Sequence, residues 1–181
     1  MSGLSTRDQT LLLLLGLAAV LYLYSRTDQG QQVTADIADA VGGALRGIRN
    51  NNPINVEKGQ PWDGLAPADQ QTDPRFAVFV DMPHGIRAAA KVMLTYRGYG
   101  LNTVHKIIDR WNPKADGQPP NYIPDVSDYM GVGPDDPIDV RDPNTMFALL
   151  RGMAREEVGK AGALLVSDAD VWAGLQLAGV A

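Results

Sequence analysis

The pattern of hydrophobic and polar positions divides the chain into two unlike parts. Residues 11–24 read LLLLLGLAAVLYLY, in which 13 of 14 residues are hydrophobic and none is charged. As a helix this run would be about 21 Å long and would have no polar face, so we predict a single transmembrane anchor over residues 10–25. The alternatives are a buried assembly helix and a cleaved signal peptide, although no small-residue cleavage site follows closely.

The rest of the chain has the mixed pattern of a globular domain. We expect residues 1–9 to form a tail, the polar and then Gly/Ala-rich residues 26–44 to form a linker, and residues 45–181 to form one domain. Apolar residues recur at helical spacing in five stretches of that domain. The expected helices begin at Pro83, at Asn102 or Thr103, near Tyr122, at Asp142-Pro143 (continuing to about Lys160) and near Ser167.

Two short segments have the pattern of strands instead. Ile54–Val56 follows the Asn-Pro turn at residues 50–53, and Arg75–Val80 alternates between apolar and other side chains. Residues 59–74 have the composition of a loop, so these segments are expected to pair as a small β-hairpin with a long connection. The predicted class is therefore mainly α (α+β), a globular domain preceded by one transmembrane helix.

Composition then narrows the chemistry. The chain carries a net charge of −5 and no cysteine, which disfavours nucleic-acid binding and excludes disulfides, thiolate metal sites and a cysteine nucleophile. His84 and His105 stand 21 residues apart without a group of carboxylates around them, and the aspartates near Pro137 lack the spacing of a calcium loop. We therefore predict no metal and no cofactor.

Two glutamates are the candidate catalytic residues. On a helical wheel with Met146 at zero, Glu157 falls at about 20°, inside the apolar stripe formed by Leu150 and Met153. A carboxyl group on that stripe should have a raised pKa, as a general acid for glycoside cleavage requires, unless the helix end is solvated. Glu57 is the second candidate, with an exposed ion pair as the alternative.

The asparagines of the turn are candidate ligands for sugars. Asn51, Asn52 and Asn55 supply amide groups that suit sugar hydroxyls and N-acetyl groups. The alternative is that these side chains only close the turn by bonding to their own backbone.

Four segments together resemble a group of phage and prophage virion proteins. Their hallmarks are an R-G-I-R-N-N-N-P-x-N-[IV] start, an F-x-x-F strand, a G-I-R-A helix, a T-[VL]-x-x-I-I-x-R-W segment and an N-x-Y-x-x-x-V segment. Here they correspond to RGIRNNNPINV (46–56), FAVF (76–79), GIRA (85–88) and TVHKIIDRW (103–111), and to NYIPDV (121–126), which lacks the residue between the asparagine and the tyrosine. The resemblance implies other virion proteins as partners.

The pattern is also similar to the latter part of bacterial glucosaminidases of lysozyme-like fold, with an N-N-x-F-G-I-K turn before a hairpin. This implies a lysozyme-like domain facing peptidoglycan, with Tyr122 and the three asparagines positioning the glycan. Those enzymes carry the catalytic glutamate upstream of the turn, whereas residues 35–47 here contain Asp36 and Asp39 but no glutamate. Many phage relatives instead end a C-terminal helix in a Glu-Asn-Gly-like triplet, and Glu157-Val158-Gly159 corresponds to it here.

Three functions follow as hypotheses. The first is a membrane-anchored, virion-associated peptidoglycan glycosidase (muramidase or lytic transglycosylase-like) acting in phage entry or exit, with partners in peptidoglycan and in lipid through residues 10–25. The second is a virion structural membrane protein without turnover. The third is a lysis protein with a releasable anchor, which the strongly apolar LLLLL run disfavours. The expected location is the virion, the bacterial inner membrane with the domain facing the periplasm, or both.

Overall fold

The computed structural model describes residues 27, 29, 42 and 46–181 of the chain. The chain divides into two units, Met1–Gly42 and Gly43–Ala181, and the fold given below is that of the second unit. The tail predicted over residues 1–9 and the anchor predicted over 10–25 lie outside the described residues, as does most of the predicted linker.

The described part of the second unit is built from helices joined by irregular segments. Residues 46–49 are also helical. The longer helices are α3 (Met82–Gly98), α4 (Val104–Trp111), α5 (Tyr122–Met130), α6 (Pro143–Glu157) and α8 (Asp168–Ala178). The short ones are α7 (Gly159–Gly162) and the 3-10 turns η1 (Ala68–Gln70), η2 (Lys114–Asp116) and η3 (Ala163–Leu165).

The helices begin where local chemistry favours a helix start. The side chains of Asp81, Thr103, Asp142 and Ser167 each accept a hydrogen bond from a backbone amide in the first turn of the helix that follows. The five helices predicted from the sequence are therefore confirmed. The helix from Pro143 is shorter than expected because it ends at Glu157 and the chain turns at Gly159, which has a φ of 69°.

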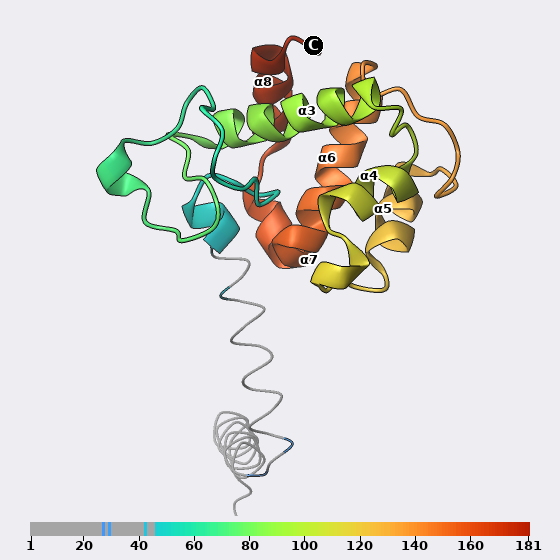
Figure 1. Cartoon of the computed structure of the whole chain (residues 1–181), viewed down its shortest axis with the longest axis horizontal. Helices are drawn as coiled ribbons and strands as arrows, with labels where there is room; N and C mark the ends of the chain where they lie inside the picture. The colour runs from blue at the N-terminus through green and yellow to red at the C-terminus, as the bar shows by residue number, and fades with distance from the viewer. Residues whose placement is uncertain (1–26, 28, 30–41, 43–45) are drawn as a thin grey trace, which may run out of the picture. The chain divides into compact units, whose positions relative to one another are not determined.

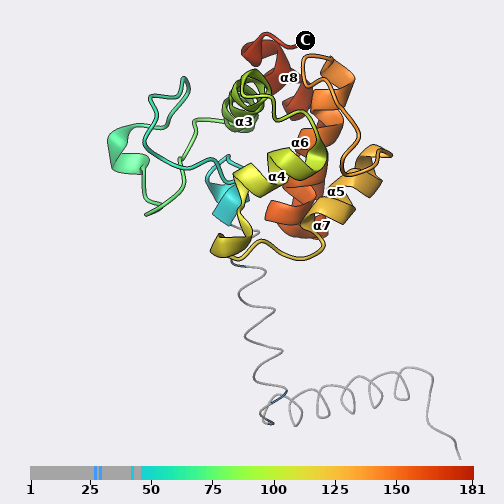
Figure 2. The ribbon, with the colours of Figure 1, turned by 45° about the vertical axis from the view of Figure 1, so that its right-hand side comes forward.

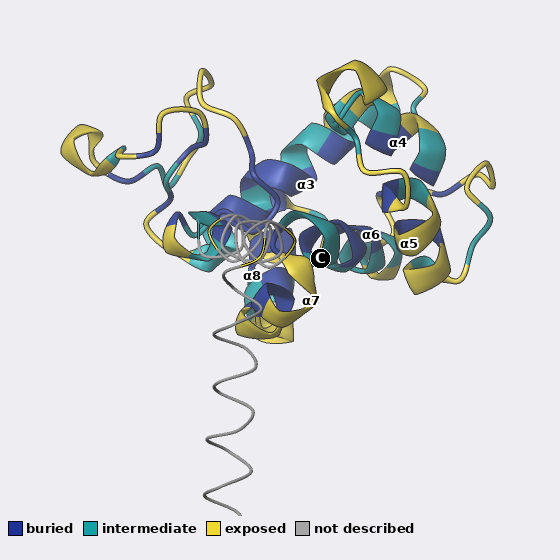
Figure 3. Ribbon diagram, turned by 90° about the horizontal axis from the view of Figure 1, so that it is seen from below, coloured by how far each residue is buried: buried dark blue, intermediate teal, exposed yellow. Residues whose placement is uncertain are grey.

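The central helix α3 organises the core. It packs along α8 and also contacts α6, and its Ile86, Ala89 and Met93 are fully buried. Figures 1 and 2 show the irregular segment 50–80 at one end of α3, with α4 and α5 at the other. Coloured by burial, α3 is a mixture of buried and intermediate residues, while the tips of the loops are exposed (Figure 3). Residues far apart in the sequence thus meet along one helix.

The predicted β-hairpin is wrong. Among residues 46–181 there is no strand, and only two isolated antiparallel bridges occur, Glu57 with Phe76 and Leu65 with Phe79. The segments do approach each other, since the Ala77 amide donates to the Val56 carbonyl at 3.0 Å. A regular ladder does not form because side-chain amides occupy its positions.

Gln71 and Asn52 are the side chains that replace the ladder. Gln71 both donates to the Val78 carbonyl and accepts from the Val78 amide, at 2.7 and 3.0 Å. Asn52 donates to the carbonyls of Val56 and Ala77 at 2.9 and 2.8 Å. The α+β, lysozyme-like class is therefore corrected to a helical domain with an irregular, side-chain-bonded segment.

The membrane part of the predicted class is not supported either. No helix in the described part of the chain is long and apolar enough to cross a membrane.

Candidate functional site

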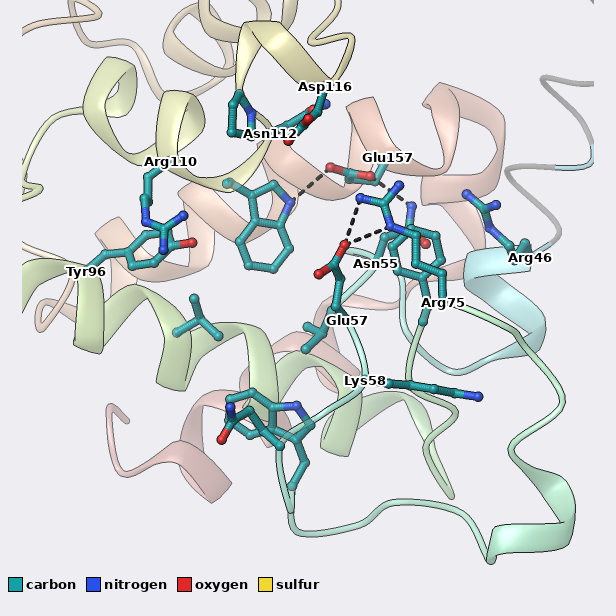
Figure 4. Close-up of a pocket in the computed structure, with 17 residues that line it drawn as sticks. Arg46, Asn55, Glu57, Lys58, Arg75, Tyr96, Arg110, Asn112, Asp116 and Glu157 are labelled. Atoms are coloured by element: carbon teal, nitrogen blue, oxygen red, sulfur yellow. Dashed lines mark hydrogen bonds and ion pairs between the residues drawn. The ribbon is translucent and has the colours of Figure 1, made fainter.

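A cleft of about 530 Å³ opens on the described surface, and Glu157 lies in its wall. One wall comes from Arg46, from residues between Asn55 and Trp62, and from Arg75 and Phe76. The rest comes from Val92 and Tyr96 of α3 and from residues between Arg110 and Asp116. Figure 4 shows the side chains that line it. The cleft is thus lined by the irregular segment 50–80, by α3 and by the end of α4.

The carboxylate of Glu157 accepts hydrogen bonds from three elements. Its Oε1 accepts from the Tyr122 hydroxyl at 2.8 Å and from the Trp111 indole Nε1 at 3.1 Å. Its Oε2 accepts from the Asn55 amide Nδ2 at 2.8 Å, and the two groups point toward each other in Figure 4. Oε1 therefore has two donors and Oε2 has one.

Local structure positions each of these groups. Trp111 is the last residue of α4, Tyr122 is the first residue of α5, and Glu157 is the last residue of α6. Asn55 reaches the carboxylate from a left-handed backbone with a φ of 56°, a conformation that asparagine tolerates better than most residues. The arrangement places one carboxyl group where the ends of three helices meet the asparagine turn.

Gly47 allows this close approach. A Cβ at position 47 would lie 2.5 Å from Cγ1 of Val158 and 3.3 Å from the Asn52 carbonyl oxygen. Any larger residue would push the asparagine turn away from the end of α6. The glycine therefore helps to hold Asn55 against Glu157.

The ionisation of Glu157 reflects two opposing influences. Burial raises the pKa of this carboxyl group, whereas the hydrogen bonds from Asn55, Tyr122 and Trp111 and the charge of Arg46 lower it. Burial prevails, so the pKa of Glu157 lies above its ordinary value. Burial and the nearby Glu157 also raise the pKa of Tyr122 well above 10, which keeps its hydroxyl protonated as a donor.

Glu57 lines the same cleft but has a different environment. Its side chain is 60% exposed and pairs with the guanidinium of Arg75 at 2.7 Å. This is the exposed ion pair that the sequence left open as the alternative. Glu57 remains within the cleft, so the structure brings both predicted glutamates to one site.

Asn51 and Asn52 are not among the residues that line the cleft. The Asn51 amide donates to the Phe79 carbonyl at 3.0 Å, and Asn52 is fully buried in its three bonds to the backbone of Val56 and Ala77. Of the six predicted residues, the geometry assembles Glu157, Glu57, Asn55 and Tyr122 at or behind the cleft. Asn52 closes the turn through Val56 instead, and Asn51 ties the turn to Phe79.

Sequence reasoning missed one donor at the site and one buried aspartate outside the cleft lining. The sequence does not predict that the indole N–H of Trp111 donates to Glu157. Asp73, buried at 3% exposure, accepts hydrogen bonds from the amides of Arg75 and Phe76 and from the Asn50 side chain. Burial raises the pKa of Asp73, but these bonds outweigh it and hold that pKa below its usual value.

A signal for Asp73 was present in the sequence, because an aspartate directly before proline often bonds to the backbone that follows. No comparable signal marks Trp111. Within the described ranges, no group of three or more histidine or acidic side chains is placed to hold a metal ion.

The chain was also compared with known proteins. No family model matches it. It is 40% identical over 94 residues to Protein P5 of Pseudoalteromonas phage PM2, a match that covers 49% of this chain. The chain spans 58% of the length of that relative, which is less than two thirds. The predicted similarity to phage proteins is thus supported, and the chain has a relative encoded by a bacterial virus.

Proposed function

We propose that this chain is a phage virion protein whose domain cleaves the glycan strands of bacterial peptidoglycan, with Glu157 as the general acid. The similarity to a phage protein supports the virion role. The observation that carries the catalytic role is a carboxyl group with a raised pKa in the wall of an open cleft. Glycoside cleavage requires such a group, because the leaving oxygen must receive a proton.

The hydrogen bonds favour Oε2 as the oxygen that carries the transferable proton. Oε1 already accepts from Tyr122 and Trp111, which occupy its two lone-pair positions. Oε2 accepts only from Asn55 and keeps one position for a proton. Protonated Oε2 donates to the bridging glycosidic oxygen as the bond from that oxygen to the anomeric carbon breaks.

The carboxylate then left on Glu157 acts as a base. In a lytic transglycosylase-like reaction it removes the proton from the C6 hydroxyl of the same sugar while that oxygen bonds to the anomeric carbon. The proton returns to Glu157, and the product is an anhydro sugar. In hydrolysis, water takes the place of the C6 hydroxyl. The first route needs only one carboxyl group, which fits the pairing of Glu57 with Arg75.

The test is cleavage of purified peptidoglycan by the full chain, measured as release of soluble glycan fragments. We expect Glu157→Gln to lower the rate by about 100-fold or more, since glutamine cannot supply a proton. Glu156→Gln is the matched control, because it makes the same change one residue earlier, outside the residues that line the cleft. Full activity in folded Glu157→Gln would contradict the proposal, as would an inactive wild-type chain on several peptidoglycan types.

A second candidate function is a structural role in the virion without turnover. The observation that favours it is the set of three hydrogen bonds that Glu157 accepts from α4, α5 and the asparagine turn. Such a network ties four segments together and needs no substrate. It predicts a folded wild-type chain that binds virion proteins and releases no glycan fragments, with reduced stability in Glu157→Gln.

A further inference from the structure

The charge of the cleft is opposite in sign to that of the chain. The whole chain carries −5, yet the residues lining the cleft include four cations and three carboxylates. One of those carboxylates, Glu57, is paired with Arg75. A positively charged cleft attracts anionic ligands and raises their concentration near the residues that line it.

Two of the cations are available to a ligand. Arg46 and Arg110 form no ion pair with any carboxylate of residues 46–181. Each guanidinium instead lies over an aromatic ring, Arg46 at 4.6 Å from the centre of Phe76 and Arg110 at 5.8 Å from that of Tyr96. These ring contacts use the face of the guanidinium and no N–H group, and a guanidinium can bind a carboxylate with two hydrogen bonds.

The positions of the two arginines suit an extended ligand. In the view of Figure 4, Arg110 and Arg46 lie at opposite sides of the labelled set, with Glu57 and Glu157 between them. Arg110 lies in the last turn of α4, whereas Arg46 precedes the asparagine turn. A ligand that contacts both arginines would pass the carboxyl group of Glu157.

We propose that the cleft selects amino-sugar strands that carry carboxylates, as the lactyl groups of N-acetylmuramic acid do, with Arg46 and Arg110 binding those carboxylates. This inference rests on the proposed glycan-cleaving function and names the substrate feature that the site recognises. It predicts weak binding of neutral amino-sugar strands of the same length.

The test is calorimetric binding of two tetrasaccharides to the full chain carrying Glu157→Gln, which prevents turnover. One probe alternates N-acetylglucosamine and N-acetylmuramic acid, and the other is chitotetraose, which has no carboxylate. We expect about tenfold tighter binding of the carboxylated probe. That preference should shrink when sodium chloride is raised from about 50 to about 500 mM, because salt screens exposed charges.

Arginine variants identify the residues responsible. In the same background, Arg46→Gln and Arg110→Gln should each weaken binding of the carboxylated probe by about tenfold and that of chitotetraose by less than about twofold. Arg141→Gln removes one exposed positive charge outside the cleft and should change neither affinity. Arg110 is exposed, so its replacement is not expected to disturb folding, and Arg46→Lys serves if Arg46→Gln does not fold.

Equal affinity for both probes, or a preference that survives both arginine variants, would overturn this inference. Absence of binding to either probe would overturn it as well. Because binding is measured without turnover, an inactive wild-type chain that still prefers the carboxylated probe would contradict only the proposed catalysis. Cleavage without the preference would contradict only the selection of carboxylates.

Discussion

Glu157 is held between burial, which disfavours its charge, and three donors, which favour it. The net effect is a folded-state pKa above the ordinary value of about 4.3. Helical periodicity was sufficient to place this glutamate on the buried stripe, because a helix end repeats the geometry of the turns before it. Periodicity could not identify its donors, since Trp111 and Tyr122 reach it through tertiary packing.

The raised pKa of Glu157 predicts the pH dependence of stability. Below the unfolded pKa the group is protonated in both states, and its contribution is fully present. As the pH rises through the folded pKa, ionisation in a buried position removes that contribution. We therefore expect the wild-type free energy of unfolding, relative to that of Glu157→Gln, to fall between about pH 4 and pH 7.

Urea unfolding of both chains across this range measures the difference. Taking the difference at each pH cancels the titration of groups that the two chains share. A wild-type advantage that grew with pH would mean that the hydrogen bonds outweigh burial.

At the level of elements, local signals predicted the helices and failed for the segment between them. A helix start is fixed by one capping side chain and the next few residues, so the sequence around Asp142 or Thr103 contains what is needed. The segment from Asn50 to Val80 is held by side chains that bond across 7 to 28 positions of sequence. The strand predicted from the alternation in Arg75–Val80 is therefore wrong: the adjacent Phe76 and Ala77 are both buried, whereas Val80 is 53% exposed.

Asn52 is the side chain on which that segment depends most. Its three hydrogen bonds, to Val56 N, Val56 O and Ala77 O, are all made in the buried interior. Asn52→Ala should lower the free energy of unfolding by about 3 kcal/mol, because it leaves buried backbone groups unpaired. Chemical denaturation measures this loss.

Asn144→Ala is the matched control for Asn52→Ala. Asn144 is exposed in the first turn of α6, and the same truncation there should change stability by less than about 0.5 kcal/mol. An equal loss in both variants would show that the bonds of Asn52 contribute little.

At the scale of the molecule, the cleft is a product of topology. Its wall draws on Arg46, on the loop after Asn55, on α3, on the end of α4 and on Glu157, which spans more than 100 positions of sequence. Of the residues that line the cleft, the sequence supplied only Asn55, Glu57 and Glu157 as candidates. Their assembly depends on how closely α8 and α6 pack on α3, which no local pattern specifies.

The contact of α8 with α3 gives the prediction that belongs to this scale. Gly174 lies where a Cβ would be 2.5 Å from Cγ2 of Ile86 and 2.8 Å from the Pro83 carbonyl oxygen. Gly174→Ala should therefore force the two helices apart and lower the free energy of unfolding by about 2 kcal/mol. Gly98, at the end of α3, has no such neighbour within 4 Å, so Gly98→Ala should leave stability unchanged or slightly raised.

Because neither glycine lines the cleft, folded protein of both variants should keep the tetrasaccharide affinity of the parent chain. Calorimetric unfolding separates the two variants, and equal midpoints would show that α8 can shift on α3 without cost.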